Sequence, residues 1–175
     1  MNSEIQIETD RLFLRPIGSV DVEDVFNYRT DRITNKFQGW IPKTKEDVKE
    51  FITKRNCTIF NKANTWFQFV ITLKNENIVV GDLGIHFLDE GSKSVELGCT
   101  LAKAHHAKGF ANEAIDAIIR FLSQEYEKNA FYANIISDNK QSLVLFKRIG
   151  FKKIGEELID DGKITLYKFL FTNRD

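Results

Sequence analysis

The chain has 175 residues, of which 42% are hydrophobic, which is enough apolar material for one domain with a sizeable core. Its 25 Lys and Arg residues balance 25 Asp and Glu residues, and a net charge of zero argues against a surface whose main task is to neutralise a nucleic-acid backbone. The N-terminus lacks an apolar signal region and no long apolar run follows, so we expect a cytoplasmic protein without a membrane segment, formed by residues 1–175 as a single domain.

The first part of the chain predicts one strand and two helices. Residues 12–17 are typical of a strand, and residues 19–29 of a helix with acidic side chains in its first turn. Thr44 and Asp47 have the spacing of a capping box, which predicts the start of a second helix. The apolar stripe of this helix extends to Phe60.

The remaining elements alternate between strands and helices. In chain order they are an antiparallel meander at 66–73, 78–88 and 94–101, a helix that begins near 110, a strand at 130–136, a helix at 141–149 and a closing hairpin that turns at 160–162. The helix near 110 has one apolar face, which should pack on the sheet, made of Phe110, Ala114, Ile118, Phe121 and Leu122. The pattern predicts an α+β fold.

The cysteines and histidines indicate neither a disulfide nor a metal site. Cys57 falls in the second predicted helix and Cys99 in a predicted strand, so both are expected to be reduced. His105 and His106 are adjacent, but neighbouring side chains point apart and no third ligand is suitably spaced. We therefore expect no metal.

The turn that follows the strand at 94–101 has the features of an anion-binding site. Thr100 and Leu101 end the strand, and residues 108–111 start the next helix, so unpaired N–H groups and the positive end of the helix dipole face one spot. Gly109 lets the backbone approach a ligand without a Cβ atom, and Lys108 adds charge. These residues favour a phosphate ligand, and an ordinary strand-to-helix turn is the alternative.

A second segment downstream carries a family resemblance. It resembles the acyl-CoA half of the GNAT superfamily of N-acetyltransferases through Ile136, Asn139, Ser142, Phe146, Gly150 and Phe151. The loop at 106–111 is similar to the pyrophosphate loop of that superfamily, Gln/Arg-x-x-Gly-x-Gly/Ala, with His106 in place of Gln or Arg. The segments at 8–16, 21–29 and 39–40 resemble the ribosomal-protein N-terminal acetyltransferase (Rim-type) branch.

This resemblance implies a GNAT-like domain with a mostly antiparallel twisted sheet of about six to seven strands flanked by helices. It implies transfer of an acetyl group from acetyl-CoA to a primary amine by direct attack on the thioester, the acceptor being a protein N-terminal α-amine or a small-molecule amine. One alternative is a detoxifying acetyltransferase for a polyamine, aminoglycoside or amino-acid analogue. Another is a non-catalytic acyl-CoA-binding regulatory module. We expect a monomer or homodimer without direct nucleic-acid binding.

The resemblance also assigns cofactor-binding residues. Asn139 would bind the pantetheine amide and Ser142 would lie near the sulfur, where a hydrogen bond stabilises the departing thiolate. Phe146 stands where many relatives carry a tyrosine regarded as the general acid, and a phenyl ring has no proton to donate. The complete implied cofactor set is Cys99, Thr100, Leu101, His106, Ala107, Lys108, Gly109, Phe110, Ala111, Asn139, Ser142 and Phe146.

The candidate general base comes from strand alternation. Alternation at 94–101 places Val95, Leu97, Cys99 and Leu101 on one face and Glu96 on the other. Because Glu96 is a carboxylate close in sequence to the proposed cofactor turn, it could accept the proton of the amine or contact the substrate. The alternative is that Glu96 pairs with a basic neighbour or lies at a solvent-exposed edge. Phe37 and Trp40 lie in a region that flanks the acceptor groove in the resembling fold.

Overall fold

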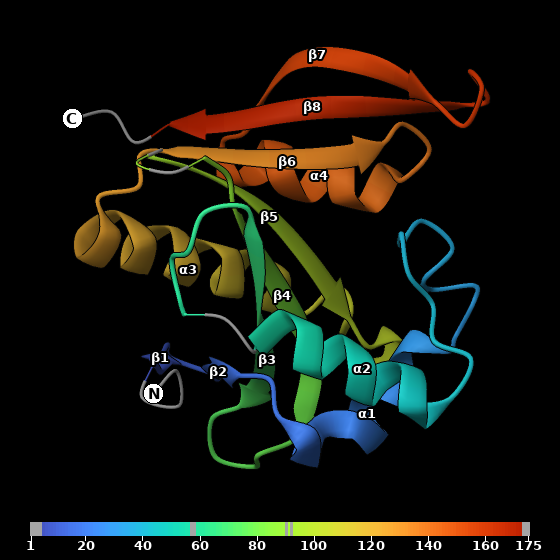
Figure 1. The fold of residues 1–175 in the computed structure, drawn as a ribbon, viewed down its shortest axis with the longest axis vertical. Coiled ribbons are helices and arrows are strands. Elements are labelled where there is room, and N and C mark those ends of the chain that lie inside the picture. The colour runs from blue at the N-terminus through green and yellow to red at the C-terminus, as the bar shows by residue number, and fades with distance from the viewer. Residues whose placement is uncertain (1–4, 57–58, 90, 92, 173–175) are drawn as a thin grey trace.

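The computed structural model describes residues 5–56, 59–89, 91 and 93–172 and shows the expected α+β architecture (Figure 1). Its elements are β1 (Ile7–Glu8), β2 (Leu12–Pro16), α1 (Val22–Arg29), α2 (Lys45–Asn56), β3 (Thr65–Leu73), β4 (Val79–Phe87), β5 (Ser94–Leu101), α3 (Phe110–Tyr126), β6 (Ala130–Ile136), α4 (Lys140–Ile149), β7 (Lys152–Ile159) and β8 (Ile164–Thr172). Short 3-10 turns, η2 (Ser19–Asp21) and η3 (Lys103–His105), precede α1 and follow β5.

All strands form one eight-stranded sheet in the order β1-β2-β3-β4-β5-β6-β8-β7. Neighbouring strands are antiparallel except β5 and β6, which are parallel. The mostly antiparallel sheet predicted from the sequence is confirmed. The sheet has one strand more than the six to seven expected, because the two residues of β1 pair with Phe13 and Leu14 of β2.

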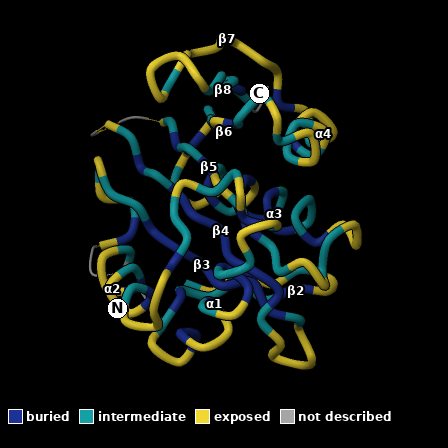
Figure 2. Tube along the Cα trace, turned by 90° about the vertical axis from the view of Figure 1, so that its right-hand side faces the viewer, coloured by how far each residue is buried: buried dark blue, intermediate teal, exposed yellow. Residues whose placement is uncertain are grey.

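Two helical layers cover the sheet. The larger core joins α3 to the meander strands through Ala114, Ile115, Ile118, Phe67, Leu83, Ile85 and Leu97. A second cluster joins α1 and α2 to the other face of β3 through Val25, Val48, Ile52 and Val70. Figure 2 shows that the buried chain is concentrated in β2, β3 and β4, whereas β7 lies at the surface. The apolar face predicted for α3 is confirmed, since four of its residues belong to the larger core and the fifth, Phe121, packs against it.

The second helix is shorter than predicted. The capping box is present, because the Asp47 N–H donates to Thr44 Oγ1 at 3.2 Å and the Thr44 N–H donates to Asp47 Oδ2 at 3.0 Å. The helix ends at Asn56, however, and Phe60 lies beyond it, 8% exposed in the core under α3. The chain leaves the helix because Phe60 packs against Phe67 and other aromatic rings on the opposite side of the sheet. Cys57, expected in this helix, lies outside the described residues.

Among the described residues, no helix is both long enough and apolar enough to cross a bilayer.

The closing hairpin turns where expected, with Asp160, Asp161 and Gly162 all at positive φ. β7 is almost entirely exposed, so the hairpin extends from the edge of the sheet instead of forming core (Figure 2).

Candidate active site

The two parallel strands at the centre of the sheet separate after a short paired segment. β5 and β6 pair at three positions, and the last pair is Glu96 with Tyr132. β5 then continues to Leu101 and β6 to Ile136, and the two ribbons diverge (Figure 1). Beyond Glu96, the backbone N–H and C=O groups of β5 that face β6 therefore have no partner in a β5–β6 ladder. The sheet contains a wedge whose edge offers hydrogen bonds to a ligand.

The loop after β5 leads from this wedge to the start of α3. His106 Nε2 lies 2.9 Å from the carbonyl oxygen of Leu101, so the side chain ties the loop to the end of the strand. Ala107 and Gly109 have left-handed φ angles of 59° and 83°, which turn the chain sharply. Gly109 is the N-cap of α3 and provides no side-chain cap. The first N–H groups of α3 are therefore left for an external acceptor, as the sequence predicts.

Helix α4 and its N-cap hold three of the residues assigned from the resemblance. Asn139 is its N-cap, and Asn139 Oδ1 accepts a hydrogen bond from the Ser142 N–H at 3.2 Å. Phe146 lies one turn further along, is 5% exposed, and packs edge-to-face against Phe151 at 4.9 Å. The Asn139 side chain thus caps its own helix, and the Phe146 ring is held by Phe151.

Glu96 lies at the closed end of the wedge, on the face opposite α3. Asn134 Nδ2 donates to Glu96 Oε1 at 2.9 Å, and His86 Nδ1 lies 3.7 Å from Glu96 Oε2. The Glu96 side chain is 23% exposed, so solvent reaches the carboxylate. Glu96 therefore has a basic neighbour, as expected for a structural role. It is also accessible to solvent, as required of a general base.

A row of stacked rings and cations connects Glu96 with Trp40. His86 stacks on Trp66 at 4.7 Å, and Trp40 stacks on Phe51 at 4.4 Å. Arg55 lies between these pairs, 4.5 Å from the Trp66 ring and 5.2 Å from the Phe51 ring. The structure thus brings Trp40 and Glu96 to the same side of the sheet. Trp40, Phe51, Arg55 and Trp66 also line an open groove of about 590 Å³ along α2.

Phe37 lies in the loop between α1 and α2, apart from this row. Its ring is half-buried, and the Lys36 ammonium lies 4.7 Å from the ring centre. Loop residue Phe37 is therefore placed by contacts within the loop, whereas Trp40 is placed by α2.

A buried ionic cluster beside the end of β5 was not predicted from the sequence. Asp82 accepts hydrogen bonds from Tyr28, from Gln68 and from Arg29, whose Nε lies at 3.0 Å. Asp82 also lies opposite Thr100 in the β4–β5 register. Burial and the neighbouring Asp82 charge together raise the pKa of Tyr28 well above its ordinary value. The signal in the sequence was an aspartate inside a run of apolar and glycine residues in β4.

The thiol of Cys99 faces the α3 side of the sheet, whereas the Asp82 cluster lies on the α1 side. Burial, reinforced by the Asp82 charge, raises the pKa of Cys99 to about 12, so the side chain stays a neutral thiol at physiological pH. Cys99 is a free cysteine and packs against the larger core. The contribution of this position to any ligand site is therefore its backbone.

A model of the acetyltransferase (GNAT) domain matches residues 11–152. The uncharacterized N-acetyltransferase p20 of Bacillus licheniformis is 28% identical over 149 residues, 84% of this chain and 82% of that protein. The ribosomal protein uS5-alanine N-acetyltransferase of Escherichia coli (strain K12) is 24% identical over 169 residues, 91% of this chain and 86% of that protein.

Solved structures share the fold. A GNAT-family acetyltransferase from Bacillus anthracis superposes with a TM-score of 0.83 at 23% identity, covering 96% of this chain and 98% of that one. The microcin C7 self immunity acetyltransferase MccE superposes with a TM-score of 0.81 at 19% identity, covering 94% of each chain. The chain belongs to the GNAT acetyltransferase family and is an acetyltransferase. The resemblance to the Rim-type branch is confirmed by relatives that include ribosomal-protein acetyltransferases.

Proposed function

We propose that this acetyltransferase transfers the acetyl group of acetyl-CoA to a primary amine, a protein N-terminal α-amine or a small-molecule amine, by direct attack of the amine on the thioester. The observation that carries the proposal is the wedge between β5 and β6, with Glu96 at its closed end and the α3 N-terminus, which lacks a side-chain cap, beyond its open end. MccE, which shares this fold, was solved in complex with acetyl-CoA and AMP.

The residues along the wedge suit the parts of acetyl-CoA. The N–H groups at 108–111 and the Lys108 side chain would hold the pyrophosphate, since α3 starts with a positive dipole end and no side-chain cap. Asn139 and Ser142 would contact the pantetheine arm from α4. The backbone N–H groups of 99–101 would donate to the thioester carbonyl, because β6 does not pair with that part of β5.

Bound acetyl-CoA supplies an activated acyl group, and the chain supplies proton transfer and charge stabilisation. Glu96 would accept the proton of the attacking amine, directly or through water, while the β5 backbone stabilises the tetrahedral oxyanion. Ser142 would donate a hydrogen bond to the departing sulfur. With a thiol pKa near ~8.5, the thiolate needs no full proton transfer at neutral pH, so a phenyl ring at Phe146 is compatible with turnover.

An α-amine is the acceptor that this site serves most easily. An α-amine has a pKa of about 7.7 to 8.0 and is partly neutral at physiological pH, whereas a lysine-like amine, near ~10.4, demands a stronger base. Glu96 is one solvent-accessible carboxylate and shares its oxygens with Asn134 and His86. A peptide N-terminus approaching along Trp40 and Trp66 would meet it from the α2 side.

The decisive experiment incubates the protein with acetyl-CoA and a panel of peptides and small amines, and detects acetylated products by mass spectrometry. Acetylation of peptide N-termini supports the favoured acceptor, and acetylation of polyamines, aminoglycosides or amino-acid analogues alone would assign a detoxifying role. Binding of acetyl-CoA without any acetylated product would contradict catalysis and indicate a regulatory module.

A further inference from the structure

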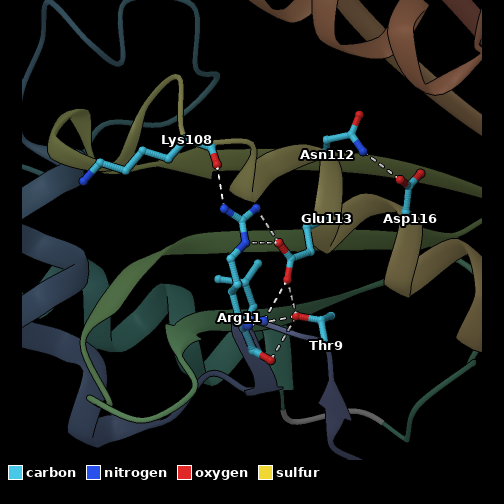
Figure 3. Close-up of polar contacts among 7 residues, drawn as sticks. Thr9, Arg11, Lys108, Asn112, Glu113 and Asp116 are labelled. Atoms are coloured by element: carbon cyan, nitrogen blue, oxygen red, sulfur yellow. Dashed lines mark hydrogen bonds and ion pairs between the residues drawn. The ribbon is translucent and has the colours of Figure 1, made fainter.

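The segment that precedes β2 is hydrogen-bonded to the start of α3, although 102 residues separate the partners (Figure 3). Arg11 is the centre of this contact. Its Nη1 donates to the carbonyl oxygen of Lys108 at 3.0 Å, and its Nε donates to Glu113 Oε2 at 2.7 Å. Arg11 therefore holds the chain on both sides of Gly109, the left-handed residue at the N-cap of α3.

Glu113 is bound by more than the guanidinium. Its Oε1 accepts from the Thr9 hydroxyl at 2.6 Å and from the Arg11 backbone N–H at 3.0 Å. Burial acts to raise the pKa of Glu113, but the hydrogen bonds from Thr9 and Arg11 outweigh it and lower the pKa. Glu113 is therefore ionised at neutral pH and is neutralised by its partner.

The bond to Lys108 orients an amide of the proposed pyrophosphate site. A trans peptide is planar, so the N–H of Gly109 points opposite to the carbonyl of Lys108. Because Arg11 holds that carbonyl toward β2, the Gly109 N–H is turned to the other side of the loop. An amide with a set direction binds an anion without the entropy cost of ordering the loop first.

The Arg11 guanidinium is engaged by contacts within the protein. Its guanidinium bonds to Lys108 and Glu113 and lies 4.7 Å from the centre of the Phe110 ring. A Cβ atom on Gly109 would lie 3.3 Å from Arg11 Nη2, so the guanidinium packs directly against the loop. Its positive charge also offsets the Glu113 carboxylate, which in the first turns of α3 would otherwise repel a bound anion.

We propose that Arg11, Glu113 and Thr9 form a clamp that positions the 108–111 loop for the pyrophosphate of the acyl donor, with Arg11 as the positioning residue. The inference rests on the proposed function of this loop. The clamp acts on the nucleotide half of the donor and not on the reacting thioester, and this difference makes it testable.

The test compares acetyl-CoA with acetyl-pantetheine, which carries the same thioester but no pyrophosphate. Arg11→Gln and Glu113→Gln should each weaken CoA binding by about 10- to 100-fold, the effect of losing a charge-assisted hydrogen bond. The loss should appear in KM for acetyl-CoA with little change in kcat. Acetyl-pantetheine turnover should stay within about twofold of the parent, because that donor does not use the clamped loop.

Two further variants distinguish an effect of the clamp on CoA binding from an effect on folding. Arg11→Lys retains the charge and should recover part of the CoA affinity. Lys168→Gln breaks the exposed Lys168–Glu157 ion pair between β7 and β8, at the opposite edge of the sheet from Arg11, and should leave CoA affinity unchanged. Thermal unfolding of each variant identifies any that fail to fold.

Three results would contradict the proposal. Unchanged CoA affinity in folded Arg11→Gln protein would overturn the clamp and leave the proposed function intact. Equal losses with acetyl-CoA and acetyl-pantetheine would show that Arg11 acts on the fold of the whole site, which also overturns it. Failure of the parent protein to bind CoA would overturn the proposed function, and the clamp with it.

Discussion

The two sides of the β5–β6 wedge are built in different ways. On the proposed donor side, the 106–111 loop presents backbone groups, and its shape is set by the His106 contact and by the Arg11 bonds to neighbouring residues. On the proposed acceptor side, the surface consists of side chains that include Trp40, Trp66 and Glu96. A ligand site made of backbone groups depends on the conformation of the chain, so it tolerates a change of side chain such as His106 in place of Gln or Arg. A ligand site made of side chains changes its specificity with each substitution. This contrast explains why the donor is easier to infer than the acceptor.

The largest effect is expected from Glu96→Gln, which keeps the shape and removes the base on the acceptor side. Turnover should fall by roughly 10²- to 10⁴-fold while CoA affinity stays nearly unchanged. Raising the pH should restore part of the rate, from near neutrality for an α-amine and a few pH units higher for a lysine-like amine. Steady-state kinetics across pH measure this, with exposed Glu156→Gln on β7 as the control. Parental turnover in a folded variant would assign Glu96 to structure.

The buried Arg29–Asp82 ion pair lies next to the proposed acceptor surface, since the Arg29 guanidinium is 5.4 Å from the centre of the Trp40 ring, and breaking the pair should destabilise the fold. Arg29→Met leaves the Asp82 carboxylate buried without its cation, so the free energy of unfolding should fall by about 3 to 5 kcal/mol. Urea unfolding measures the change. Lys49→Met, which removes the exposed partner of Glu46, should have no measurable effect. Equal stability of the two variants would show that the cluster does not hold α1 on the sheet.

Ligand binding tests the donor side directly. Acetyl-CoA at ~100 times its dissociation constant should stabilise the folded state by about 2.7 kcal/mol, because it binds the folded loop and not the unfolded chain. Differential scanning calorimetry with and without acetyl-CoA measures the shift. The absence of any shift with millimolar acetyl-CoA or CoA would remove the proposed donor.

A pair of glycines distinguishes backbone strain from loss of the donor site. Gly109→Val and Gly162→Val both force a side chain into a left-handed conformation, at φ angles of 83° and 81°, which costs about 1 to 2 kcal/mol. A Cβ atom at Gly162 has no neighbour within 4 Å, whereas one at Gly109 presses on Arg11. Only Gly109→Val should lose CoA affinity, measured by isothermal titration calorimetry. Equal affinities in the two variants would place the donor site elsewhere.

The smallest expected effect concerns acid stability of the clamp. The hydrogen bonds of Glu113 lower its pKa in the folded state, so its stabilisation is present above the ordinary value of 4.5 and is lost as the pH falls through the lowered value. The Tm difference between the parent and Glu113→Gln should therefore be largest near neutral pH and shrink below about pH 4. A difference independent of pH would show that the Glu113 charge does not stabilise the fold.

Features whose causes lie within a few residues could be predicted from the sequence alone. The helical repeat that contains Ala114 and Ile118 predicted the buried face of α3, and strand alternation placed Glu96 on the opposite face from Val95. The glycine-containing turn around Gly109 predicted a helix start without a side-chain cap. Local steric effects and side-chain periodicity act over one or two turns, so their structural consequences can be predicted from neighbouring residues in the sequence.

Contacts between distant segments, by contrast, became visible in the folded chain and could not be predicted from the sequence. Arg11 meets Glu113 because β2 and α3 pack together, and Asp82 finds Arg29 because α1 covers β4. Phe60 leaves the helical pattern because the free energy of burying its ring on the far side of the sheet exceeds that of extending α2. The separation of β5 from β6 beyond Glu96 is likewise a property of the assembled sheet. These outcomes depend on which surfaces meet after folding, and no periodicity along the chain encodes them.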